Sequence, residues 1–140
     1  MATPYRHEIR VSWGNCDPAQ IAYTGWIPWW ALESINGWWE AHLGGDGWFQ
    51  MELDRGYGTP FVRMEMDFRH PVTPRHRLIC EVRPVRLGDK SITFHVDGYQ
   101  DDVLCFEGQF TSVFIVSETF KSRSAPPEIR AIIEPLLDAG

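Results

Sequence analysis

The stretch TGWIPWWALESINGWWEAHL, residues 24–43, decides the fold that we expect for this chain. Pro28 fits only in a first helical turn, where its missing N–H has no partner, and the glycine pair at 44–45 ends the run. Because aromatic residues lie on more than one side of such a helix, it must be covered nearly all round. The spacing of one helix face is shown by Ile27, Trp30, Ala31, Ser34, Ile35 and Trp38.

The remaining elements are expected to be mostly strands. Residues 7–13 alternate polar and apolar side chains, with Ile9, Val11 and Trp13 on one side. Short helices are expected near residues 47–55 and after Pro126-Pro127. Further alternating runs cover residues 62–68, 78–82, 92–96 and 104–116, which we interpret as an antiparallel meander of four strands. The order of one strand, a long helix and then several strands is typical of an α+β protein. A sheet wrapped around the helix would bury it.

Composition excludes several classes of protein. A chain of 140 residues with 44% hydrophobic residues is expected to form a single domain, 1–140. A net charge of -6 disfavours nucleic acid as a partner, and no apolar run approaches the ~20 residues of a membrane helix. The first residues lack the pattern of a secretory signal, so we expect a cytoplasmic protein. Three widely spaced cysteines without a CxxC pair argue against a disulfide framework and a zinc site.

The run GNCDPAQIAY, residues 14–23, joins the first strand to the helix. Pro18 biases Asp17 away from helical dihedral angles, which predicts a loop that leads into the helix. On its own, an Asp in such a loop is more often a turn former or a helix cap than a catalyst. Cys16 has no His base beside it in the sequence, so we interpret it as a packed neighbour of Asp17.

Together with RGYGTPFV, residues 55–62, and GDKSITF, residues 88–94, this run resembles the hot-dog fold acyl-CoA thioesterases. The nearest resemblance is to the 4-hydroxybenzoyl-CoA thioesterase type. It implies a hot-dog fold, in which an antiparallel sheet wraps around one long central helix. It also implies an acyl-CoA substrate, of which coenzyme A is a part, and no separate cofactor or metal. The expected assembly is a homo-oligomer, with a dimer as the minimal active unit and a tetramer as the complete assembly.

The resemblance assigns roles to particular residues. Asp17 falls on the catalytic carboxylate, and the backbone N–H groups of Tyr23 and Thr24 fall where the thioester carbonyl is polarised. The substrate-binding positions would be Cys16, Gln20, Trp48, Thr59, Pro60 and Phe61. The coenzyme A-binding positions would be Arg75, Arg86, Lys90 and Ser91.

These roles agree with the chemistry of a thioester. Hydrolysis needs a nucleophile or a base for water, together with dipoles where the oxyanion forms. Asp17 can serve as either, and the N-terminus of a helix offers unpaired N–H donors with about half a positive charge. The acyl group, aryl or medium-chain, stays open, as does the choice between nucleophile and base.

Two positions depart from the family pattern. The family often has Gly at position 20 and His or Tyr at position 24, where this chain has Gln20 and Thr24. Specificity, or a loss of activity, should therefore be sought there. The alternatives are a thioesterase for acyl carrier protein and a non-catalytic protein that binds acyl thioesters. A hot-dog dehydratase is disfavoured, because it relies on a His where this chain has Thr24.

Overall fold

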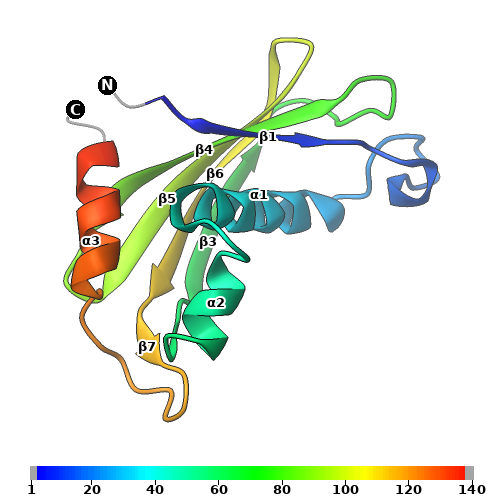
Figure 1. Cartoon of the computed structure of the whole chain (residues 1–140). Helices are drawn as coiled ribbons and strands as arrows, with labels where there is room; N and C mark the ends of the chain where they lie inside the picture. Colours follow the sequence, from blue (N-terminus) through cyan, green and yellow to red (C-terminus); the bar gives the residue numbers. More distant parts are fainter. Residues whose placement is uncertain (1–2, 138–140) are drawn as a thin grey trace.

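A five-stranded antiparallel sheet and an 18-residue helix form most of the structure, a computed structural model that describes residues 3–137 (Figure 1). The elements in chain order are β1 (Tyr5–Ile9), η1 (Trp13–Asn15), α1 (Trp26–Leu43), α2 (Trp48–Leu53), β2 (Tyr57–Gly58), β3 (Phe61–Phe68), β4 (Leu78–Leu87), β5 (Ser91–Gln100), β6 (Val103–Val113), β7 (Ile115–Val116), α3 (Pro127–Ile133) and η2 (Glu134–Leu136).

The strand order of the main sheet is β1-β4-β5-β6-β3. The expected meander of four strands is wrong in one respect, because β3 lies beyond β6 at the sheet edge and not beside β4. The connection between β3 and β4, residues 69–77, contains Pro71 and Pro74. Proline disfavours continued strand pairing, and this connection is too long for a tight hairpin, so the chain crosses past β6 and β5 to β4, which lies between β1 and β5. The expected strand 104–116 is also interrupted, since β7 leaves the main sheet to pair with β2.

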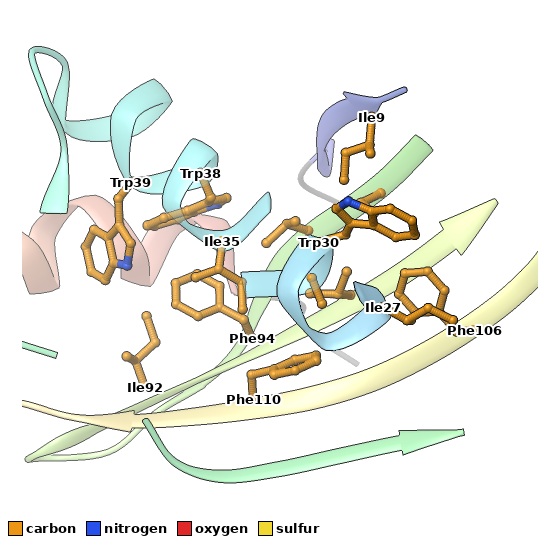
Figure 2. Packing of buried hydrophobic residues seen from close by; sticks show 14 of the residues in the cluster. Ile9, Ile27, Trp30, Ile35, Trp38, Trp39, Ile92, Phe94, Phe106 and Phe110 are labelled. Carbon is orange, nitrogen blue, oxygen red and sulfur yellow. The ribbon is translucent and has the colours of Figure 1, made fainter. Parts of the chain in front are cut away.

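Helix α1 packs against β1, β4 and β5 and fills the core above the sheet. Figure 2 shows its apolar side chains directed at aromatic residues of the sheet. The Trp38 ring lies edge-on to Phe94 at 4.9 Å between centroids, and Trp39 meets the same ring at 5.8 Å. Gly37 lets β1 approach closely, because a Cβ there would come within 2.8 Å of His7 Nδ1. Within residues 3–137, none of the helices combines the length and the apolar character needed to cross a bilayer.

The C-terminal helix α3 begins at Pro127, as the sequence predicts, and packs on β4. Ile129 and Ile133 are fully buried there. Arg130 Nη2 donates a hydrogen bond to Gly88 O at 2.8 Å, which joins α3 to the turn between β4 and β5. In Figure 1 this turn and α3 lie at the left of the molecule, whereas η1 and the β3–β4 connection lie at the right.

Strand β3 carries apolar side chains that the protomer leaves exposed. Met64 pairs with Phe110 in the sheet, so both side chains face the side on which α1 packs. Phe110 is fully buried, but α1 packs chiefly on β1, β4 and β5, and Met64 is 52% exposed. Val62 and Phe68 are also more than half exposed. The free edge of the sheet is thus bordered by an uncovered apolar strip.

Candidate active site

The loop that follows η1 fixes the position of Asp17. Its N–H donates to Ile21 O at 3.0 Å, and its carbonyl accepts the Gln20 N–H at 2.9 Å. The side-chain oxygen Oδ1 accepts the Ala19 N–H at 2.8 Å. This is the local Asp-turn geometry in which a short acidic side chain satisfies the backbone two residues on. The carboxylate is therefore held in one orientation by its own loop.

Gln20 completes this loop in an unusual backbone conformation. Its φ of 67° lies in the left-handed region, where a side chain costs roughly 1–2 kcal/mol and glycine costs little. This explains physically why glycine suits the position. Gln20 instead places an amide at the same cavity as Asp17.

The Asp17 loop is joined to the β3–β4 connection. The Ala22 N–H donates to Val72 O at 2.8 Å, and Cys16 pairs with Ala22 across the loop. Val72 is almost completely buried. The two segments, far apart in sequence, therefore form one wall.

A cavity of about 1000 Å³ lies at this wall. It brings together four of the residues predicted from the sequence, namely Cys16, Asp17, Gln20 and Arg75. Eight further residues line it, and none of them was predicted as a site residue; those with charged or aromatic side chains are Arg10, Trp13, His76 and Arg77. For His76 and Arg77 the sequence signal was the RHR run at 75–77, in a part of the chain that is rich in arginine, whereas Arg10 and Trp13 had no such signal.

Gln100, at the end of β5, holds the loop that carries Arg75 and His76. Its side chain is only 4% exposed. Oε1 accepts the Thr73 N–H at 2.8 Å, while Nε2 donates to Thr73 O at 2.7 Å and to His76 O at 2.9 Å. A buried amide with both ends satisfied keeps this loop in place.

Trp13 lies elsewhere than the sequence predicts. The alternation of residues 7–13 places it on the buried face with Ile9 and Val11, and those two residues are indeed buried. Pairing with β4 ends at Ile9, however, and the chain then turns into η1. Trp13 is consequently 92% exposed at the edge of the cavity.

The other predicted substrate-binding residues line a second, smaller cavity of about 280 Å³. It lies between α1, α2 and the start of β3, with an apolar wall that includes Trp39 and Phe120. The predicted members of this group are Trp48, Thr59, Pro60 and Phe61. Within one protomer, these predicted substrate-binding residues therefore line a different cavity from Asp17.

The remaining predicted coenzyme A contacts lie away from both cavities. Lys90 and Ser91 are at the turn between β4 and β5, beside α3 (Figure 1). Arg86 lines a groove on the face of the sheet opposite α1, together with Thr93 and Thr111. Of the four predicted coenzyme A residues, only Arg75 shares a cavity with Asp17.

Of the two backbone N–H groups predicted to polarise the carbonyl at the start of α1, one is free. The Tyr23 N–H donates to Asn15 O at 2.8 Å and is engaged inside the loop. The Thr24 N–H has no acceptor among residues 3–137, and the helix has no side-chain cap at Gly25. Neither Tyr23 nor Thr24 lines the large cavity.

The three cysteines are free, and two of them are core residues. Burial raises the pKa of the Cys80 thiol to about 12, and burial also raises the pKa of Cys105. Cys16 is half-buried, with Sγ 3.6 Å from Ser12 O, and it is the one thiol at the cavity. His76 lines the same cavity, which the sequence did not indicate.

One group of side chains on the outer face of the sheet has potential metal ligands. The ligand atoms of His95, Asp97 and Glu107 lie within 4.8 Å of one another. Arg83 approaches Asp97 at 3.5 Å and Arg69 approaches Glu107 at 3.4 Å, so both carboxylates already face a cation. The arrangement is that of an ion-pair network, which stabilises two acidic residues paired across adjacent strands.

Known proteins share this architecture. The family model of the Thioesterase-like superfamily matches residues 11–133. A thioesterase-superfamily structure from Jannaschia sp. CCS1 is 57% identical with a TM-score of 0.95, covering 97% of this chain and 94% of that one. Two more distant structures share the fold. A 1,4-dihydroxy-2-naphthoyl-CoA thioesterase from Synechocystis is 19% identical with a TM-score of 0.80, covering 93% of this chain and 96% of that one. A DHNA-CoA thioesterase from Staphylococcus aureus is 15% identical with a TM-score of 0.77, covering 85% and 78%.

No match was found among curated proteins. The family match spans most of the chain, from the end of β1 to the end of α3. The antiparallel sheet with helices packed on it agrees with this match. The chain therefore belongs to the thioesterase-like superfamily and has the hot-dog thioesterase fold.

Proposed function

We propose that this protein is an acyl-CoA thioesterase of the 4-hydroxybenzoyl-CoA type, which hydrolyses an aryl or medium-chain acyl-CoA to the free acid and coenzyme A. The observation that carries the proposal is the placement of Asp17. Its carboxylate is held by its own loop at a cavity of about 1000 Å³, in a chain of the thioesterase-like superfamily. Arginines line the same cavity and suit an anionic substrate on a protein of net charge -6.

Asp17 has two routes to the product. As a general base, it takes a proton from water, and the water oxygen attacks the carbonyl carbon. As a nucleophile, it forms a mixed anhydride with release of the thiolate, and water then opens the anhydride and restores the carboxylate. In both routes the thiolate leaves and takes up a proton. The free Thr24 N–H at the start of α1 is the proposed donor to the oxyanion, an interaction worth about 3 kcal/mol in related sites.

The active unit is proposed to be a dimer that pairs through β3. The strand has a free edge and an apolar strip at Val62, Met64 and Phe68. Exposed edges and apolar strips of this kind favour association with a second copy. Antiparallel pairing about a two-fold axis places the Phe68 end of one β3 beside the Phe61 end of its partner.

This pairing would complete the site. The β3–β4 connection, which forms part of the Asp17 cavity, follows Phe68, whereas Phe61 lines the small apolar cavity. Asp17 of one protomer would then work with Trp48 and Phe61 of the other, so that the acyl group enters the partner's cavity. We further propose a tetramer of two such dimers in the cytoplasm, with no cofactor or metal and no nucleic-acid partner.

The test is hydrolysis of a panel of acyl-CoA esters that differ in length and aromaticity, measured by release of free thiol. Asp17→Asn should lower kcat by about 10³-fold or more while the circular dichroism spectrum and the oligomeric state stay unchanged. Cys16→Ala separates carboxylate from thiol chemistry: removal of a substrate contact would raise KM, but kcat should fall far less than in Asp17→Asn. Full turnover in a folded Asp17→Asn protein would refute the proposed role.

Two other outcomes distinguish the alternatives. Rapid hydrolysis of acyl carrier protein thioesters without competition from free coenzyme A would indicate a carrier-protein thioesterase. Tight binding of acyl-CoA with no thiol release over hours would indicate a non-catalytic binding protein.

A further inference from the structure

Three guanidinium groups surround the cavity that holds Asp17. Arg10 comes from the segment after β1, while Arg75 and Arg77 come from the β3–β4 connection. Arg77 lies 3.8 Å from Glu8, in an exposed pair of little energetic weight. Among residues 3–137, the side chains of Arg10 and Arg75 form no ion pair. The positive charge at this cavity is therefore available to a ligand.

The segment that carries two of these arginines is preorganised. Gln100 fixes Thr73 and His76 by three hydrogen bonds, and Thr73 Oγ1 accepts the Arg75 N–H at 3.2 Å. The same segment is bonded to the Asp17 loop through Ala22. A backbone that is already ordered lowers the entropic cost of binding an anion.

Trp13 adds a flat apolar surface at the same place. Its side chain is almost fully exposed, but its backbone is fixed, because the Ser12 N–H donates to Asn15 Oδ1 at 2.8 Å and the Cys16 N–H donates to Trp13 O at 3.1 Å. An exposed indole on a rigid turn is a platform on which a heteroaromatic base can stack. Guanidinium groups beside such a platform are the usual partners of phosphate, which they bind through two parallel hydrogen bonds.

We infer that Arg10, Arg75 and Arg77, with Trp13, bind the phosphorylated nucleotide half of coenzyme A in the same protomer that supplies Asp17. This inference rests on the proposed function. The diphosphate and the 3′-phosphate meet the arginines, and the adenine stacks on the indole. The pantetheine arm then runs inward to bring the thioester to Asp17. Arg86, Lys90 and Ser91, which lie away from this cavity, are not needed for the contact.

The test compares two thioesters of the same acyl group, one on coenzyme A and one on N-acetylcysteamine, which lacks the nucleotide. Arg10→Ala, Arg75→Ala and Trp13→Ala should each raise KM for the acyl-CoA by about 5–20-fold with kcat within about twofold. The kcat/KM for the N-acetylcysteamine thioester should not change. Arg6→Ala is the matched control, because this exposed arginine pairs with Glu81 on β4 and does not line the cavity.

Several results would overturn the inference. Equal losses on both thioesters would mean that the arginines serve the acyl group or the reaction itself. A rise in KM for Lys90→Ala but not for Arg75→Ala would place the nucleotide at the turn between β4 and β5. If acyl carrier protein thioesters showed the same dependence on the arginines and a lower KM than acyl-CoA, the ligand of the arginines would be an acidic carrier protein and not the nucleotide.

Failure of the proposed function gives a separate result. If the wild-type protein hydrolyses none of the acyl-CoA esters, titration calorimetry with adenosine 3′,5′-bisphosphate still measures the nucleotide site. Binding that is lost in Arg75→Ala and kept in Arg6→Ala would support the nucleotide site without hydrolysis. Absence of binding to the wild type would overturn it.

Discussion

Gln20 stores strain beside the proposed catalytic carboxylate. Its φ of 67° is unfavourable for every residue with a Cβ. The free energy of unfolding of Gln20→Gly should therefore exceed that of Gln20→Ala by about 1 kcal/mol, which is measured as a higher urea concentration at the unfolding midpoint. Both variants lose the amide, so both should change the preference among acyl groups. Equal unfolding midpoints for the two variants would show that the left-handed conformation is not kept in solution.

The buried thiol of Cys80 should make the free energy of unfolding depend on pH in the alkaline range. Burial raises its pKa from 9.0 to about 12, so the neutral thiol is favoured in the folded state. Its contribution to stability is complete below pH 9 and is lost as the pH rises from 9 towards 12. Over that window the free energy of unfolding should fall more steeply in the wild type than in Cys80→Ala, by up to about 1.4 kcal/mol per pH unit. Urea unfolding at several pH values measures the slopes, and parallel slopes would contradict a buried neutral thiol.

At the scale of elements, the loop between β3 and β4 depends on one side chain of β5. In Gln100→Glu the carboxylate can still accept the Thr73 N–H, but it faces the carbonyl oxygens of Thr73 and His76, to which only its protonated form can donate. We therefore expect KM for acyl-CoA to rise several-fold from pH 5.5 to pH 8 in Gln100→Glu, with a smaller change in kcat. The wild type should lack this extra dependence.

A purely structural role for Gln100 would give another pattern. Gln100→Leu removes the side-chain partner of three backbone groups, the N–H and carbonyl of Thr73 and the carbonyl of His76, so the free energy of unfolding will fall in any case. The informative readout is the KM of Gln100→Glu against pH. A pH-independent KM would show that Gln100 supports the fold without positioning the arginines.

The sequence predicted which segments form helices and strands better than it predicted which strands lie side by side. Helical spacing, Pro28 and the glycine at 44 predicted α1 to within two residues of its start. The alternation of Met64 and Met66 predicted a strand, but alternation is the same whichever strand lies alongside, so it could not place β3 beyond β6. The sequence likewise could not show that Arg10 and Arg77 line the same cavity as Asp17, because the cavity forms where separate loops meet.

At the scale of the whole molecule, the proposed dimer can be broken at its apolar strip. Met64→Asp places a charge on an exposed position of β3 that the partner strand would bury, and an unpaired buried charge is strongly unfavourable. We expect this variant to sediment as a monomer and to lose activity, although the Asp17 loop is untouched. Glu65→Lys, a change on the opposite face of the same strand, should remain a dimer.

Sharing of the site between two copies can be tested by mixing inactive variants. Asp17→Ala removes the carboxylate, and Thr59→Trp should fill the small cavity of about 280 Å³ and block the acyl group. If Asp17 works with the partner's cavity, a heterodimer of these variants has one site with both defects and one site with none. Random exchange of subunits should then restore about a quarter of the wild-type activity per mole of protomer. Asp17→Ala mixed with Asp17→Asn is the control and should restore nothing. If each protomer used its own cavity, both sites of the heterodimer would carry one defect, and the Asp17→Ala and Thr59→Trp mixture would stay as inactive as its components.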